Sequence, residues 1–155
     1  MIFHVSIAAD DPFKVASVIA ELWGGEARVF PPVGEGSAVA LSGDERGTTI
    51  EVYAAGTELV PADGDADAMV VVNGKGPQPT ATHAAIATLL SADEVHRIAQ
   101  REGWIAKYRK RGGHFGVIEF WLENTTMLEV LTAEMQAEYT GLMAAGGPPW
   151  SRIDR

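Results

Sequence analysis

An internal duplication is the feature that most limits what this chain can fold into. One segment begins at His4 and a second begins at His83. Each contains an apolar stretch, then a helical pattern, and later a short apolar segment that starts with two threonines. That last segment carries a glutamate in each copy: Glu51 lies 47 positions after His4, and Glu129 lies 46 positions after His83. Self-similarity at this spacing predicts that the 155 residues form two similar modules that share one core.

The two copies have the same predicted secondary structure, a strand followed by a helix and three further strands. Asp11 before Pro12 is typical of a helix start in the first copy, and Ser91 with Glu94 three residues later is a capping box in the second. A glycine follows each helical pattern and ends it. The predicted strands are 3–8, 27–30, 37–41 and 48–53 in the first copy and 82–88, 104–109, 115–122 and 126–131 in the second.

These patterns predict an α+β fold in which two βαβββ modules form a paired half-barrel, with a helix near the C-terminus. The predicted modules are residues 1–56 and 81–132. They are joined by an insertion, 57–80, that is rich in Gly, Pro and Asp and contains the apolar run 68–72, an extra strand or an edge hairpin. Residues 133–155 are predicted to form a short helix and a tail, whose Trp150 packs against a neighbouring subunit or folds back.

Composition excludes several classes of function. The chain has no cysteine, which removes disulfides and thiolate chemistry, so any metal must be held by nitrogen and oxygen. Its net charge of −9 disfavours nucleic acid as a partner, and no apolar run is long enough for a membrane helix. The basic run 107–111 is predicted to be a solvated hairpin edge, or else a contact for an anionic small molecule. We therefore expect a cytoplasmic protein that binds a small molecule.

Strand alternation places the repeated histidines and glutamates on the same faces of their sheets. The bulky aliphatic side chains of each module must cover its helix, so His4 and Glu51, and likewise His83 and Glu129, lie on the opposite face. If these two faces turn towards each other, the four side chains meet in one cleft. Neutral imidazole and carboxylate suit a divalent transition metal such as Zn, Ni, Fe, Mn or Co. The alternative is four ordinary polar residues on a solvated sheet.

Paired βαβββ modules, with one ligand near the start of the first strand and another in the last, resemble the vicinal oxygen chelate superfamily. This superfamily includes glyoxalase I, extradiol dioxygenases and the bleomycin- and fosfomycin-resistance proteins, and the resemblance covers residues 2–132. The residues that the resemblance assigns to the metal are His4, Glu51, His83 and Glu129, a set most similar to that of glyoxalase I. It implies a lyase or isomerase whose substrate chelates the metal through two neighbouring oxygens, with Glu129 or Glu51 moving the proton.

The resemblance leaves the substrate and the assembly open. Tyr53 and Trp121 could line an apolar pocket on the face that carries the histidines. Arg28 and Lys107 could pair with a substrate carboxylate or phosphate, with packing or solvation as the alternative for all four residues. The metal site could form within one chain or across a homodimer, and a homodimer is the expected assembly. Two other functions fit the same fold: a metal-free protein that sequesters an aromatic or antibiotic ligand, and a non-haem iron dioxygenase.

Overall fold

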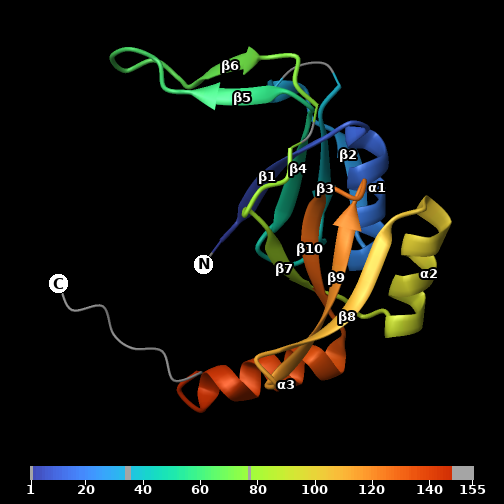
Figure 1. Cartoon of the computed structure of the whole chain (residues 1–155). Coiled ribbons are helices and arrows are strands. Elements are labelled where there is room, and N and C mark those ends of the chain that lie inside the picture. Colours follow the sequence, from blue (N-terminus) through green and yellow to red (C-terminus); the bar gives the residue numbers. More distant parts are fainter. Residues whose placement is uncertain (1, 34–35, 77, 148–155) are drawn as a thin grey trace.

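Two open four-stranded sheets form the body of the molecule in the computed structural model, which describes residues 2–33, 36–76 and 78–147 (Figure 1). The first sheet, in the order β1-β4-β3-β2, contains β1 (His4–Ala9), β2 (Glu26–Val29), β3 (Ala38–Leu41) and β4 (Thr49–Ala54). The second, in the order β7-β10-β9-β8, contains β7 (Ala84–Ala87), β8 (Ile105–Arg111), β9 (Phe115–Leu122) and β10 (Thr126–Leu131). In both sheets the first strand runs parallel to the last, and the other neighbours are antiparallel. The predicted α+β fold is confirmed.

One helix belongs to each sheet, and each begins at the predicted cap. Helix α1 (Pro12–Trp23) follows Asp11, whose carboxylate accepts a hydrogen bond from a backbone N–H of the first turn at 3.1 Å. Helix α2 (Ala92–Glu102) begins with the capping box of Ser91 and Glu94. Both helices end at a glycine with a left-handed φ of 68° or 72°, which glycine adopts without steric penalty. We call β1–β4 with α1 the first module and β7–β10 with α2 the second module.

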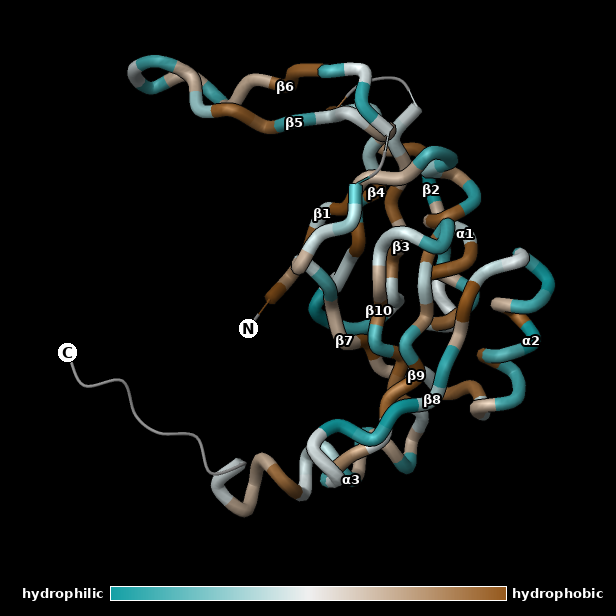
Figure 2. Tube along the Cα trace, viewed as in Figure 1, coloured by the Kyte–Doolittle hydropathy of each residue, from teal (hydrophilic) through white to brown (hydrophobic). Residues whose placement is uncertain are grey.

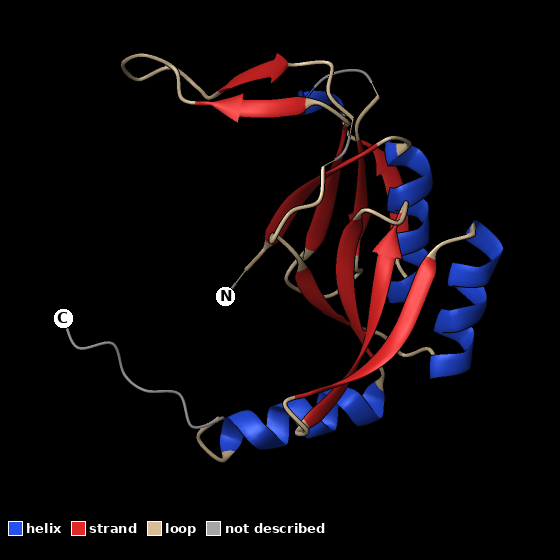
Figure 3. Cartoon of the chain, in the orientation of Figure 1, coloured by secondary structure: helices blue, strands red, loops and turns tan. Residues whose placement is uncertain are grey.

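A single hydrophobic core joins the two modules. It contains the fully buried side chains of Leu22 in α1, Val95 in α2 and Phe120 in β9. The helices also meet at the surface, where Arg101 of α2 binds Glu21 of α1 at 2.6 Å. Figure 3 shows α1 and α2 on one side of the sheets. The opposite sheet faces therefore lie away from both helices.

The insertion between the modules forms a hairpin that stands away from both sheets (Figure 1). Its strands β5 (Thr57–Val60) and β6 (Met69–Val72) pair antiparallel with each other as a separate two-stranded sheet. The predicted extra strand within 68–72 is confirmed as β6, but the alternative of an edge hairpin is wrong, because β5 and β6 pair with neither four-stranded sheet. Strand β5 was missed because four residues are too few for a clear period-two pattern. We call residues 57–72 the arm.

The C-terminal part of the described chain is the predicted helix, α3 (Ala133–Ala144). It packs against β9, where Met135 is buried and the rings of Tyr139 and Phe115 meet edge to face at 5.1 Å. A short 3₁₀ turn, Pro31–Val33, lies between β2 and β3. The tail that carries Trp150 lies outside the described residues. Among the helices that the structure describes, none is long and apolar enough to cross a bilayer.

Candidate functional site

Two equivalent rows of side chains cross the sheet faces that lie away from the helices. The strand registers define the rows, because residues directly opposite each other in a ladder share a face. The first row, in order across the sheet, is Ser6, Glu51, Val39 and Arg28. The second row is Ala85, Glu129, Glu119 and Lys107. The duplication therefore gives Glu51 and Glu129 equivalent positions, and it does the same for Arg28 and Lys107.

Each module adds a histidine at the same place beside its row. His4 lies two residues before Ser6, which directly faces Glu51. In the same way, His83 lies two residues before Ala85, which directly faces Glu129. Diagonal neighbours of this kind are about 7–8 Å apart, close enough for both side chains to reach one ion between them. We call His4 with Glu51 the first half-site and His83 with Glu129 the second half-site.

The two histidines line one cavity, but the two half-sites stay separate within a chain. A cavity of about 490 Å³ is lined from both β1 and β7, and His4, His83 and Trp23 contribute to its wall. Across residues 2–33, 36–76 and 78–147, no group of three or more His, Asp and Glu side chains is placed to hold a metal. A single chain thus does not gather the four predicted ligands.

Glu51 is held by two hydroxyl groups. Its Oε2 accepts hydrogen bonds from Ser6 Oγ at 2.9 Å and from the Tyr53 hydroxyl at 2.5 Å. Tyr53 is buried and stacks on Phe30, with ring centroids 6.5 Å apart. Burial raises the pKa of Tyr53, and its hydrogen bond to Glu51 raises that pKa further. Both donors are neutral, so they orient the Glu51 carboxylate without cancelling its charge.

The raised pKa of Tyr53 should be visible in a pH titration. The folded chain should hold this proton to higher pH than the unfolded chain, so this contribution to stability is complete at neutral pH and is lost as pH rises above about 10. We expect the tyrosinate absorbance to contain a late component that Tyr53→Phe removes and the control Tyr139→Phe retains. A late component that persists in Tyr53→Phe would contradict this assignment.

Glu129 is held by an arginine instead. At the end of β8, Arg111 places Nε 2.7 Å and Nη2 2.5 Å from Oε1 of Glu129, and its Nη1 lies 3.0 Å from Glu119. Both carboxylates are mostly buried, with side-chain exposures of 13% for Glu129 and 16% for Glu119. The basic run 107–111 does lie on an edge strand. The prediction that it is simply solvated is wrong for Arg111, which neutralises two facing carboxylates.

The four predicted substrate contacts lie in different surroundings. Tyr53 is buried, and Trp121 is half-buried on β9. Arg28 is exposed and binds Glu26 at 2.8 Å, while Lys107 is exposed on the edge strand β8. Substrate contact by these four residues stays a prediction.

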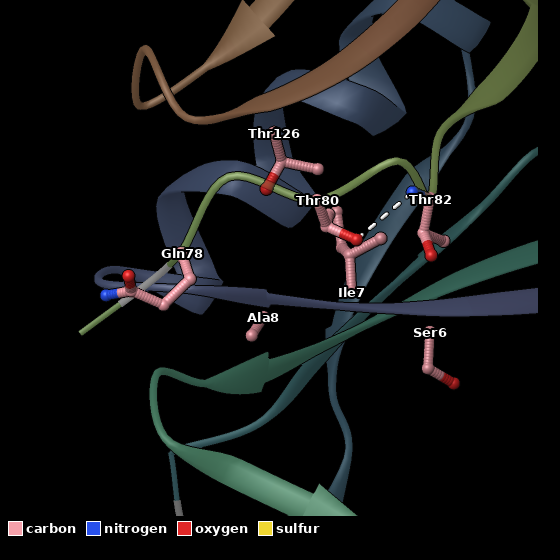
Figure 4. A pocket seen from close by; sticks show the side chains of 7 residues that line it. All are labelled: Ser6, Ile7, Ala8, Gln78, Thr80, Thr82 and Thr126. Atoms are coloured by element: carbon pink, nitrogen blue, oxygen red, sulfur yellow. Dashed lines mark hydrogen bonds between the residues drawn. The ribbon is translucent and has the colours of Figure 1, made fainter. Parts of the chain in front are cut away.

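A second cavity, of about 220 Å³, adjoins the hydrogen bonds of Glu51 through Ser6 (Figure 4). Its lining residues are Ser6, Ile7, Ala8, Gln78, Thr80, Thr82 and Thr126. Figure 4 shows segment 78–82 passing beside β1, with the Thr82 backbone N–H donating to Thr80 Oγ1 at 3.1 Å. The lining offers hydroxyls and an amide without a charged group, which suits a neutral polar ligand. Sequence reasoning missed this cavity because segment 78–82 has no periodic pattern.

Comparison with known proteins places this geometry in a known fold. No protein-family model matches the sequence, and no curated protein matches it significantly. The fosfomycin resistance protein FosX from Listeria monocytogenes is 16% identical with a TM-score of 0.57, covering 91% of this chain and 96% of that chain. Lactoylglutathione lyase from Agrobacterium tumefaciens is 13% identical with a TM-score of 0.53, covering 86% of this chain and 94% of that one. The chain has the vicinal oxygen chelate fold.

A third solved structure of the same fold contains ligands. It is a mutant of the Listeria monocytogenes FosX complexed with Mn(II) and dihydroxypropylphosphonic acid. It is 16% identical to this chain with a TM-score of 0.53, covering 84% of this chain and 87% of that chain. The resemblance inferred from the duplicated modules is thus confirmed at the level of the fold.

Proposed function

We propose that this protein is a metal-dependent lyase or isomerase of the glyoxalase type, acting on a small substrate that chelates the metal through two neighbouring oxygens. The observation that carries the proposal is the equivalence of the two half-sites, because each module has a histidine and a glutamate in the same strand register. The Mn(II) and vicinal diol in the FosX mutant structure support this class of ligand.

The donor atoms of the half-sites fit a divalent transition metal. Nδ1 of His83 lies 2.9 Å from the carbonyl oxygen of Ala81. A carbonyl only accepts, so Nδ1 carries the proton and Nε2 of the neutral ring presents its lone pair, the form that a metal requires. Two imidazole nitrogens with two carboxylates suit Zn, Ni, Fe, Mn or Co.

We propose that two copies of the chain complete the site. The first half-site of one copy would face the second half-site of the other, which gives a homodimer with two equivalent sites. The separation of the half-sites within a chain supports this arrangement over the alternative of a site in a single chain.

Glu51 is the better placed of the two candidate proton shuttles. When bound, a metal of this type polarises the substrate oxygens as a Lewis acid. The hydroxyls of Ser6 and Tyr53 bind one oxygen of Glu51 and fix its orientation, which leaves Oε1 to take and return a substrate proton. Oε1 of Glu129 is instead held by the guanidinium of Arg111, which occupies the oxygen that would have to reach a substrate. His4 and His83 act as ligands alone.

Metal titration of the purified protein, without an affinity tag, tests the proposal. We expect about one Ni or Zn per chain, and we expect His4→Ala and His83→Ala each to weaken binding by about 100-fold or more. His114→Ala, which removes an exposed histidine outside both half-sites, should bind as the wild type does. Binding below about a tenth of an equivalent, or equal affinity in all four proteins, would contradict the proposal.

A metal-free binding protein is the second candidate. It is favoured by one observation, that Glu51 and Glu129 already have protein partners in Tyr53 and Arg111. In that case, His4→Ala would leave the affinity for an aromatic ligand intact while the ligand changed the tryptophan fluorescence. Equal ligand affinity with and without added metal would favour this second candidate.

A further inference from the structure

The arm carries apolar side chains that its own chain leaves uncovered. On one face of the arm, Leu59, Val70 and Val72 are 53%, 43% and 71% exposed. On its other face, Met69 and Val71 are also exposed. Figure 2 shows hydrophobic stretches, in brown, on this projecting hairpin. An isolated two-stranded hairpin is at best marginally stable in water, and contiguous apolar surface of this kind marks an interaction site.

The direction of the arm is fixed at its base. Strand β4 passes into β5 through Ala55 and Gly56, and the Ala55 N–H donates to the carbonyl of Ala9 at 2.8 Å. The Asn73 N–H donates to the carbonyl of Gly56 at 2.9 Å. Gly56 has a φ of 82°, and a Cβ there would lie 2.8 Å from a backbone oxygen of the returning chain. The arm is therefore tied to the strand that carries Glu51.

Helix α3, at the opposite end of the molecule, also leaves apolar side chains uncovered. Figure 3 shows the arm and the far end of α3 projecting towards the same side, away from α1 and α2. Among the residues of α3, all of which are described, Met135 alone is buried. Tyr139 is exposed, and Leu142 and Met143 are half-buried.

The arm is acidic, and the β8–β9 hairpin beside α3 is basic. The arm contains Glu58, Asp63, Asp65 and Asp67 and no cation. The β8–β9 hairpin, residues 105–115, contains Lys107, Arg109, Lys110 and Arg111 and no acid. This hairpin lies beside α3, because Lys110 binds Glu138 of α3 at 2.6 Å. Lys110 is paired with Glu138 of α3, and Arg111 is paired with Glu119 and Glu129, so the exposed cations that this end offers to a partner are Lys107 and Arg109. One end thus pairs apolar surface with an acidic loop, and the other pairs apolar surface with the cationic edge of a hairpin.

We infer that the arm clasps a second copy of this chain. The arm face that carries Leu59, Val70 and Val72 packs on α3 of that copy. The arm loop that carries the aspartates lies beside the β8–β9 hairpin of that copy. A two-fold axis makes the contact reciprocal, so each copy gives one arm and receives one. This contact extends the proposed function, since it would hold the two sheet faces of a dimer opposite each other. The evidence for the contact is the exposed surface of the arm itself.

Lysine substitutions on the arm test the apolar contact. Leu59→Lys combined with Val72→Lys should raise the dimer dissociation constant by about 100-fold or more, measured by sedimentation equilibrium. These side chains are exposed in the single chain, so its fold should survive, which circular dichroism checks. Phe13→Lys, at a 45% exposed position on α1, is the matched control and should change the constant by less than about twofold.

Charge reversal tests the orientation of the clasp. Asp65→Lys with Asp67→Lys makes the arm basic, and Arg109→Glu with Lys110→Glu makes the hairpin acidic. Each variant alone should dimerise poorly, whereas a mixture of the two should form a heterodimer about as tight as the wild type, because both of its contacts are again attractive. Arg109 and Lys110 are themselves exposed, and the Arg109 contact with Glu119 is long, at 3.8 Å. Because Glu119 is mostly buried, circular dichroism checks that the second variant folds.

Separate outcomes distinguish this inference from the proposed function. Three results would overturn the clasp. The wild-type chain could be monomeric at about 100 µM, the dimer dissociation constant of the arm variant could lie within twofold of the wild-type value, or the mixture of charge-reversed variants could fail to form a heterodimer. Metal titration of the same samples tests the proposed function. A dimer that depends on the arm yet binds no metal would refute the function alone, and a metal-binding dimer indifferent to the arm would refute the clasp alone.

Discussion

A mixture of His4→Ala and His83→Ala chains should regain metal sites that neither variant has alone. If each site joins the first half-site of one copy to the second half-site of the other, a heterodimer of the two variants has one site with both lesions and one intact site. Random pairing at equal amounts makes half of the dimers heterodimers, so about a quarter of the wild-type capacity should return. Isothermal titration at limiting metal, after the mixture has been diluted and reconcentrated to exchange subunits, measures this recovery.

The matched control places both lesions in the first module. A mixture of His4→Ala with Glu51→Ala gives heterodimers in which each site lacks one ligand, so no high-affinity capacity should return. Equal recovery in the two mixtures would show that the lesions do not act through shared sites. No recovery in either mixture would favour a site within one chain, or none.

The local structure and the rows of the candidate site follow from patterns within short stretches of sequence. Asp11 and the Ser91–Glu94 pair cap their helices as predicted, because a cap depends on residues only three positions apart. Alternation along each strand was sufficient to put Glu51 and Glu129 on the faces away from the helices. The duplication then made the registers of the two sheets equivalent.

What the sequence could not predict depends on contacts between distant residues. Arg111 belongs to a run of cations that reads as solvated, and nothing local indicates that two carboxylates on β9 and β10 reach it. The bond from Ser6 to Glu51 crosses 45 positions of sequence. The separation of the half-sites depends on how the two modules pack in their shared core, which strand and helix periodicity do not encode.

Arg111→Met should be one of the most destabilising substitutions outside the core. It leaves Glu119 and Glu129 directly opposite each other on neighbouring strands, with the 3.8 Å contact between Arg109 and Glu119 as the remaining counter-charge. Removing one partner of a buried ion pair costs about 3–5 kcal/mol, and because the Arg111 side chain is 34% exposed we expect a loss of about 1–3 kcal/mol at pH 8. Urea denaturation measures this loss in the free energy of unfolding.

The pH dependence of this loss identifies its cause. The repulsion disappears when either carboxylate takes a proton, so the folded variant binds protons more readily than its unfolded chain, and its stability falls as pH rises. The loss in the free energy of unfolding should therefore become smaller as the pH falls from 8 to 4. Arg111→Met combined with Glu129→Gln should recover most of this loss at pH 8. Arg109→Met, which removes a more exposed contact of 3.8 Å, is the control and should cost less than about 0.5 kcal/mol. A deficit that stays constant with pH would mean that Arg111 acts through packing.

Arg111 also connects the stability of the second half-site to its proposed chemistry. The guanidinium binds Oε1 of Glu129, so it competes with a metal for that carboxylate. If Glu129 is a ligand, Arg111→Met should bind metal more tightly, by about tenfold, even as the chain becomes less stable. Stability and affinity would then change in opposite directions, which general damage to the fold does not produce. Unchanged affinity would remove Glu129 from the ligand set and leave the second half-site to His83.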